Sequence, residues 1–365
     1  MQRFTAITAI FTGAVVFSSV IAVAQQPSGD GPYKVIKTAR VGGEGGSDYI
    51  YADVAARRLY IPRRAIAGVP ARLTIFNLDT LESVGEIEGV GGNGAAVDPK
   101  SGHGFTSSKP VSMFDTKTMK LIKTIDVGAA QPDGILFDAF NQRVYVFSHP
   151  TKDATVIDAK DGSVLGTIDL GGVPEQGVTD GKGTIYVVMQ DAQGSVTVVD
   201  AKTMKATAHY PFNDKGRCNG LALDGKNHVL FAACASSGNP PGQPPQPMMV
   251  ILSAVDGKVL STLPLAGGSD GAVFNPAKME AFSSHSNGTM TIVKENSPTS
   301  FTVEQNLQTM NGARTLTFDS KTNHILTMSV ERGPAPPAPP DGGRGGQGAV
   351  VPGSFTILMI GAEAK

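Results

Sequence analysis

The chain has 365 residues and a formal net charge of −1 at pH 7, with 44 glycines, 24 prolines and no tryptophan. A nearly neutral protein lacks the positive field that a general phosphate-backbone binder needs, which argues against nucleic acid as a main partner. Hydrophobic residues make up 41% of the sequence, enough for a folded core, and the glycines and prolines favour many turns and little helix.

The first 24 residues have the pattern of a secretory signal peptide. Arg3 precedes an uncharged apolar run that ends in Ala22-Val23-Ala24, a small-residue cleavage site. An uncleaved anchor is the alternative, because the run is close to the minimum length of a membrane span. We expect cleavage after Ala24, a short linker over residues 25–32, no membrane span in the mature chain, and a periplasmic or secreted location.

Two anchors recur along residues 33–361 and indicate an internal repeat. An aspartate, once an asparagine, ends the first strand of each unit, and an apolar, usually aromatic residue follows in the next strand. The anchors are Asp53, Asp98, Asp138, Asp180, Asp224, Asn275 and Asp319, followed by Tyr60, Phe105, Tyr145, Tyr186, Phe231, Phe282 and Leu326. Seven units of four short alternating strands predict an all-β protein, a seven-bladed β-propeller with four antiparallel strands per blade.

The two ends of the repeat region complement each other. The seventh unit has a third strand at 354–360 but no fourth, and only a tail over residues 362–365 remains. Near the N-terminus, KVIKTARVGG matches the fourth-strand pattern of KLIKTIDVGA in the second unit. We therefore expect residues 33–43 to complete blade seven and to close the ring, which removes exposed sheet edges.

Several strand sequences resemble a known repeat family. The runs RVYVFS, TIYVVM, ATVIDAKDGSVLGTI and VTVVDAKTMKATA are similar to the YVTN family of β-propeller repeats, the YncE-like proteins of bacterial envelopes. The resemblance covers about residues 33–361 and implies the propeller fold. It implies no particular activity, because these repeats are structural.

All long insertions are predicted on one face of the propeller. The loops between second and third strands share a face with the links between blades, and the insertions at 62–72, 236–246 and 332–353 fall in such loops. Scaffolds often carry binding residues on loops of this kind, so this face is the candidate functional face. The two later, Pro/Gly-rich insertions are either tolerated loops or a lid or partner-docking arm.

The links between blades are polar and should end at the mouth of the central channel. A ring of carboxylates with two arginines could hold a divalent cation or a small anionic or polyol ligand. Alternatively, Asp and Asn before Gly are simply good turn formers. No fixed metal-loop spacing occurs, so we assign no metal site, cofactor or catalytic residue. The candidate ligand-binding residues are Asp48, Asn93, Asp133, Glu175, Arg217, Asn219, Asp270 and Arg314.

Two histidines, His149 and His285, occupy equivalent positions at the end of the second strand in blades three and six. Imidazoles on one face could act as metal ligands or acid–base groups. These blades are not neighbours in the ring, however, and the sequence identifies no convergent partners. We therefore interpret both as surface loop histidines.

The two cysteines are predicted to form a disulfide. Cys218 opens the first strand of blade five, Cys234 closes the second, and Lys226 lies midway between them in the hairpin turn. Antiparallel partners are placed symmetrically about the turn, so the thiols should face each other, whereas a one-residue register slip would separate them. Export makes oxidation plausible. Resemblance to envelope propellers supports a structural role over a redox role.

These observations favour a monomeric binding or scaffold module whose partner is an unknown small molecule or envelope protein. The competing hypothesis is a propeller enzyme, lactonase-like or dehydrogenase-like and possibly metal-dependent, with Asp48, Asp133, Glu175 and Asp270 as its carboxylates. An electron-transfer role would need a cofactor-bearing companion, and the sequence shows no haem or quinone attachment signal. The fold alone does not choose between these classes.

Overall fold

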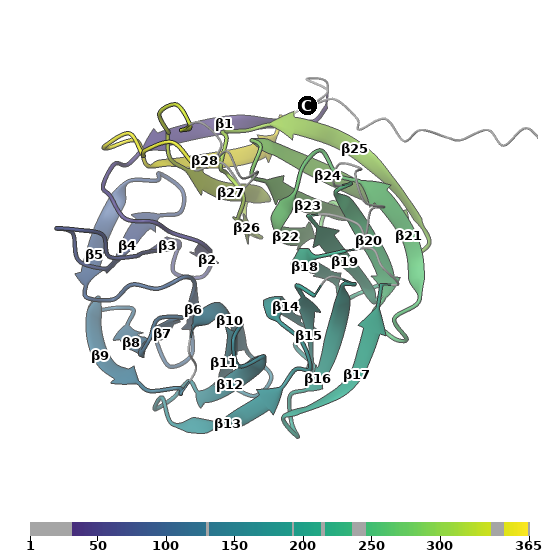
Figure 1. Ribbon diagram of the computed structural model, residues 1–365, viewed down its shortest axis with the longest axis horizontal. Helices are drawn as coiled ribbons and strands as arrows, with labels where there is room; N and C mark the ends of the chain where they lie inside the picture. Colours follow the sequence, from purple (N-terminus) through teal and green to yellow (C-terminus); the bar gives the residue numbers. More distant parts are fainter. Residues whose placement is uncertain are drawn as a thin grey trace, which may run out of the picture.

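The computed structural model describes residues 31–128, 131–191, 193–212, 216–235, 246–336 and 347–363. These residues form 28 strands in seven four-stranded antiparallel sheets and contain no helix. Figure 1 shows the sheets arranged as blades around a central axis, which confirms the predicted seven-bladed β-propeller. The predicted signal peptide, most of the linker and most of the 236–246 insertion lie outside the described residues.

The first four blades each consist of four consecutive strands, ordered from the channel outward (Figure 1). Blade one contains β2 (Tyr51–Asp53), β3 (Arg58–Arg63), β4 (Arg72–Asn77) and β5 (Ser83–Glu88). Blade two contains β6 (Ala95–Asp98), β7 (His103–Thr106), β8 (Val111–Asp115) and β9 (Lys120–Ile125). Blade three contains β10 (Pro132–Asp138), β11 (Arg143–Ser148), β12 (Asp153–Asp158) and β13 (Val164–Asp169). Blade four contains β14 (Pro174–Thr179), β15 (Thr184–Met189), β16 (Ser195–Asp200) and β17 (Lys205–Pro211).

The remaining three blades complete the ring, and the last one takes its outer strand from the N-terminal end. Blade five contains β18 (Cys218–Asp224), β19 (Val229–Cys234), β20 (Met248–Ser253) and β21 (Val259–Pro264). Blade six contains β22 (Ser269–Asn275), β23 (Glu280–His285), β24 (Thr289–Ser297) and β25 (Ser300–Gln308). Blade seven contains β26 (Leu316–Asp319), β27 (His324–Ser329), β28 (Thr356–Ala362) and β1 (Tyr33–Arg40).

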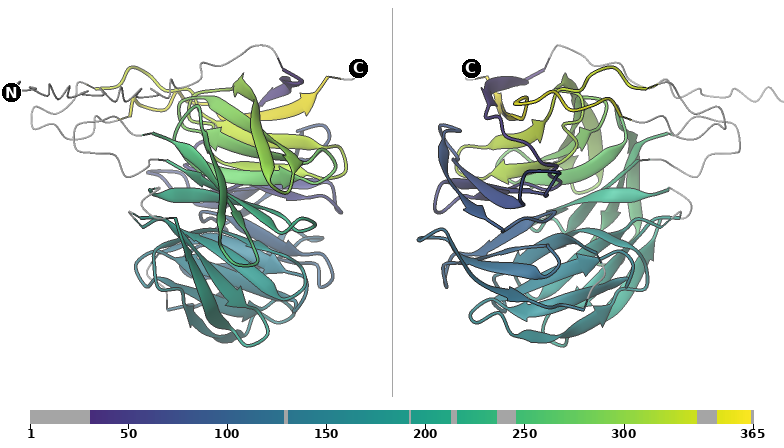
Figure 2. Two further views of the ribbon diagram at one scale, coloured as in Figure 1. Left: turned by 90° about the vertical axis from the view of Figure 1, so that its right-hand side faces the viewer. Right: turned by 60° about the vertical axis from the view of Figure 1, so that its left-hand side comes forward.

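The core lies between the blades rather than within one sheet. The middle strands β11 and β12 are buried along almost their whole length, whereas the outer strand β17 alternates between exposed and half-buried residues. Tyr145 and Val156 of blade three pack in one cluster with Ile185 and Val199 of blade four. Each sheet thus covers the apolar face of its neighbour, so strands that are apolar on both sides are buried in the ring. The side views show the twist of the blades (Figure 2).

The recurring aspartates close the first turn of the blades. Asp98 ends β6, and its carboxylate accepts hydrogen bonds from the backbone N–H groups of Lys100 (2.9 Å) and Ser101 (3.2 Å). Such a turn satisfies amides that no strand partner reaches, which is the physical reason for the repeat of this residue type. In blade four the anchor Asp180 lies one residue beyond the end of β14.

The predicted closure of the ring is confirmed. Strand β1 pairs antiparallel with β28 from Tyr33 opposite Ala362 to Arg40 opposite Thr356. Strand β28 runs to Ala362, so part of the predicted tail belongs to the sheet. Blades one and seven are also joined by an ion pair: Arg57 Nη2 lies 2.6 Å from the buried Asp319 Oδ2. The ring is therefore closed by backbone and side-chain contacts.

The predicted disulfide between Cys218 and Cys234 is present, and both residues are fully buried. The two residues are cross-strand partners, but a β-bulge separates them from the ladder that begins with Gly220 opposite Ala233. Without this bulge the register of the ladder would place Cys218 one residue past Cys234. A structural disulfide fits an extracellular or periplasmic protein.

Among the described residues, no helix is long and apolar enough to cross a membrane.

Candidate functional site

Bulges in four innermost strands place polar side chains at the channel mouth. The strand register of blades three to six shifts between Pro132 and Ile135, Pro174 and Gly177, Cys218 and Gly220, and Ser269 and Gly271. Four predicted site residues lie inside these intervals: Asp133, Glu175, Asn219 and Asp270. A bulge bends the strand and redirects a side chain. These four residues therefore lie in irregular strands rather than in turns.

Glycines beside the bulges allow the innermost strands to approach closely. A Cβ atom on Gly220 would lie 2.6 Å from the backbone carbonyl carbon of Gly271, and one on Gly271 would lie 2.9 Å from Leu316 Cδ2. Both distances are too short for a real side-chain carbon. The glycines that follow Asn219 and Asp270 are therefore required by the narrow centre of the ring, where a Cβ atom has no room.

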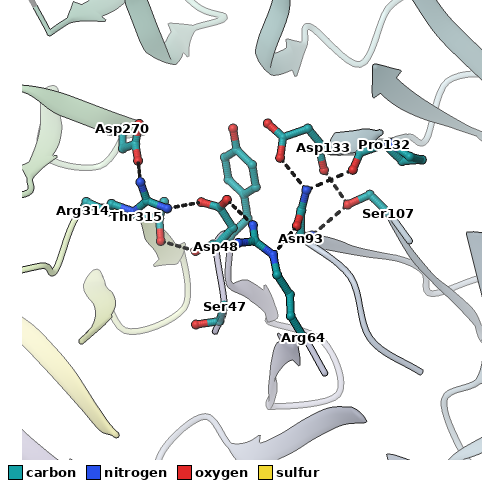
Figure 3. A network of polar contacts seen from close by, with 12 residues as sticks. Ser47, Asp48, Arg64, Asn93, Ser107, Pro132, Asp133, Asp270, Arg314 and Thr315 are labelled. Carbon is teal, nitrogen blue, oxygen red and sulfur yellow. Dashed lines mark hydrogen bonds and ion pairs between the residues drawn. The ribbon is translucent and has the colours of Figure 1, made fainter. Parts of the chain in front are cut away.

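One half of the channel mouth is a network of ion pairs centred on Asp48 (Figure 3). Arg314 bridges two acids, with Nη2 3.2 Å from Asp48 Oδ1 and Nη1 2.7 Å from Asp270 Oδ2. Arg64 Nη2 lies 2.7 Å from Asp48 Oδ2, and Asn219 donates to Asp270 over 2.8 Å. Burial raises the pKa of Asp48, and the two arginines oppose this shift. Charges in this half therefore compensate one another.

The network continues into the other half through Asn93. Its Oδ1 accepts a 2.6 Å hydrogen bond from Arg64 Nε, and its Nδ2 donates to Asp133 Oδ1 over 2.7 Å (Figure 3). Beyond Asp133 lies His149, which follows the last residue of β11; its Nε2 is 3.0 Å from Asp133 Oδ2 and 3.4 Å from Glu175 Oε1. Neither contact has the direction of a good hydrogen bond. One imidazole nitrogen and two carboxylates therefore converge on one point.

Glu175 is the most deeply buried acid of this group, with an exposed fraction of 4%. Tyr49 donates a 2.9 Å hydrogen bond to its Oε2, and the Gln190 amide donates to its Oε1. Burial, followed by the negative charge of Asp133, raises the pKa of Glu175 to about 8. Close contact with Asp133 raises the pKa of His149, although burial opposes this. The cluster of Asp133, His149 and Glu175 therefore lacks enough positive charge to keep both carboxylates ionised.

Two hollows open on either side of this network. The first, of about 630 Å³, is lined by residues of blades one to three that include Asn93, Asp133 and His149. The second, of about 730 Å³, lies between blades seven and one and is lined by Asp48 and Arg314 among others. Arg64 borders both. Both volumes lie in the range of small-molecule sites.

The structure joins seven of the eight predicted site residues into this network. The exception is Arg217, which is exposed and makes no side-chain hydrogen bond or ion pair with the described residues. The insertions at 62–72 and 332–353 border the second hollow, through Arg64 and Ile66 and through Arg332 and Val350. That the network binds a ligand stays a prediction.

The interpretation as a surface loop histidine is wrong for His285, which is fully buried with Nε2 3.0 Å from Thr291 Oγ1. His149 does lie in the turn after β11 with a side chain 30% exposed, but it has the convergent partners Asp133 and Glu175 that the sequence did not identify. Sequence reasoning also missed Tyr49, Arg64 and Gln190 as network members. The position of His149 was a usable signal, because the second strand ends beside the first strand of the same blade.

Comparisons with known proteins support the fold only. No family model matches the chain, and no curated protein sequence matches it. Among solved structures, 1608 chains match its fold. One is a chain of hydrazine synthase from Kuenenia stuttgartiensis, with a TM-score of 0.65 and 15% identity, over 85% of this chain and 95% of that chain. The resemblance to YVTN repeats stays a prediction, and the chain is a seven-bladed β-propeller.

Proposed function

We propose that this protein is an exported binding propeller of the YVTN type that holds a small polar ligand at its channel mouth through a divalent metal ion. The metal ligands would be Asp133, His149 and Glu175. The observation that carries the proposal is their convergence: one ligand atom from each lies within 4.8 Å of the others. Two carboxylate oxygens and one imidazole nitrogen are suitable ligands for Zn²⁺ or Mn²⁺.

Electrostatics support a cation at this point. Two acids share one region, Glu175 is buried, and both nearby arginines are engaged by other groups: Arg314 by two acids and Arg64 by Asp48 and Asn93. Buried carboxylates need compensating charge, and among the described residues His149 is the titratable cation that contacts both Asp133 and Glu175. A divalent ion would compensate both acids and leave His149 neutral, as metal binding requires.

The ligand follows from the surroundings of the metal. Three protein ligands leave coordination positions open, and the 630 Å³ hollow beside them is lined by polar groups of Asn93 and Ser107. A small molecule that offers oxygen atoms to the metal and presents a polar or anionic group to Lys109, which also lines the hollow, suits this site.

The second candidate is a metal-dependent hydrolase of the lactonase kind. The open coordination positions favour it, because a metal ion can hold and activate water there. Turnover of simple lactones by the metal-loaded protein, lost in the His149 variant, would establish this candidate instead of a pure binding role.

Calorimetric titration of EDTA-treated protein with Zn²⁺, Mn²⁺ and Ca²⁺ tests the metal site. We expect binding by the wild type and at least about tenfold weaker binding by His149→Gln and Asp133→Asn. His209→Gln is the matched control, since His209 is exposed on the outer strand β17. The proposal is wrong if none of the ions binds, or if the His149 and His209 variants bind equally well.

A further inference from the structure

Two buried arginines face each other beside the second hollow. Arg63 ends β3, Arg72 begins β4, and the two are direct cross-strand partners. Their exposed fractions are 1% and 8%. Like charges opposite each other in an antiparallel pair are destabilising, and burial removes the water that would screen them. Such a pair is stable only where other groups offset the repulsion.

Arg63 is only partly satisfied by its surroundings. Its Nε donates a 3.1 Å hydrogen bond to the carbonyl of Gly45, and its guanidinium carbon lies 3.6 Å from the centroid of the Phe355 ring. Its Nη2 is buried and has no hydrogen-bond partner among the described residues, and no carboxylate forms an ion pair with it there. Burial, followed by the charge of Arg72, lowers the pKa of Arg63 to about 10, so the group stays charged at neutral pH.

Arg72 has one acidic partner at the surface. Its Nε lies 3.3 Å from Glu86 Oε2, and the Glu86 side chain is 55% exposed. Its Nη2 donates to the carbonyl of Glu44 over 2.8 Å, whereas its Nη1 is buried without a partner among the described residues. Glu86 therefore pairs with Arg72 alone, and each of the two buried guanidinium groups retains a donor without a partner among the described residues.

The glycine-rich segment 43–46 lies against both arginines. A Cβ atom on Gly43, which has φ of 74°, would lie 2.8 Å from Arg72 Nη2 and 4.0 Å from Arg63 Nη1. The N–H groups of residues 43–46 donate no hydrogen bond to the described residues, and the segment lines the hollow. Successive free amides in a loop form concavities that bind anions. Backbone and side-chain donors are thus collected in one place.

We propose that the second hollow binds an oxyanion, the carboxylate or phosphate group of a small molecule, against Arg63 and the backbone N–H groups of residues 43–46, with the charge of Arg72 behind Arg63. The charge of the lining agrees, because its arginines outnumber its acids and Asp48 is already paired with two of them. The charged lining residues are Arg63, Arg64, Arg314, Arg332, Glu44 and Asp48. A guanidinium fork matches the geometry of carboxylate and phosphate oxygens. The site uses residues other than the proposed metal ligands and stands independently of them.

Thermal unfolding of EDTA-treated protein tests the site. The unfolding temperature is measured in sodium phosphate or sodium malonate and compared with that in sodium chloride at equal ionic strength. We expect the unfolding temperature of the wild type to be higher in phosphate or malonate than in chloride. Arg63→Met keeps an unbranched apolar side chain but loses the guanidinium and its donors, so its anion affinity should fall by about tenfold or more. Arg40→Met is the matched control, since Arg40 lies at the exposed outer strand.

The anion-free comparison distinguishes a ligand site from a purely structural pair. Replacing an uncompensated buried charge by an apolar side chain should leave Arg63→Met at least as stable as the wild type in chloride. If Arg63→Met does not fold, Arg63→Lys keeps the charge without the fork and should show a reduced anion shift. Equal shifts for all three salts, or an anion response retained in the Arg63 variant, would overturn the proposal.

Discussion

Replacing His285 by leucine should make the stability of the propeller less sensitive to acid. His285 ends β23 without solvent exposure, and its Nδ1 is buried without a hydrogen-bond partner among the described residues. Burial lowers the pKa of His285 from 6.5 to about 3. An imidazolium at this position would have lost its hydration, so the native state keeps the ring neutral.

The magnitude follows from proton linkage. Below about pH 6.5 the unfolded chain takes up a proton on this histidine, whereas the folded chain does so only near pH 3. The free energy of unfolding is therefore unaffected by the titration of this histidine above pH 6.5. As pH falls below 6.5, protonation of the unfolded chain lowers the free energy of unfolding by about 1.4 kcal/mol per pH unit. At pH 4.5 the loss amounts to roughly 2–3 kcal/mol.

Urea unfolding at pH 7.5, 6.5, 5.5 and 4.5 measures this effect. At pH 7.5 the leucine variant should be less stable by about 1 kcal/mol, because the hydrogen bond to Thr291 is lost. The difference should shrink as pH falls and reverse by pH 4.5. Thr291→Val is the control that leaves the imidazole: it removes this hydrogen bond together with those to Ala266 N and Asn306, so it should lower stability at every pH but keep the acid sensitivity of the wild type. A wild-type-to-variant difference that is constant across this range would refute the buried neutral histidine.

Three further changes test the packing and closure of the ring. Replacing Cys218 and Cys234 by serine should lower the free energy of unfolding by about 3 kcal/mol, measured against the oxidised protein; an unchanged value would mean that the crosslink is dispensable. Gly104→Ala should cost about 1–3 kcal/mol because its Cβ would overlap the Phe114 ring, and Phe114→Leu should relieve the cost if this overlap is its cause. Tyr33→Ala should cost about 3–5 kcal/mol, since the ring is buried where the closing strand meets blade six, and a loss below about 1 kcal/mol would contradict that role.

The sequence by itself determined the architecture. Alternation of apolar residues, the recurring aspartates and the unpaired fourth-strand pattern at the N-terminus are local signals, and each specifies a strand, a turn or a missing partner. The cysteine pair was predicted by placing the two residues symmetrically about the hairpin turn. In the structure this pairing depends on a bulge after Cys218, a feature that symmetry about the turn does not predict.

Only the tertiary structure decided the composition of the channel mouth. Asp48 and Arg314 are far apart in sequence and meet because the ring closes. His149 and His285 occupy equivalent places in the repeat, yet one faces two carboxylates and the other is buried beside a threonine. Repeat position sets the backbone path, whereas burial and charge depend on what the neighbouring blades place around each side chain.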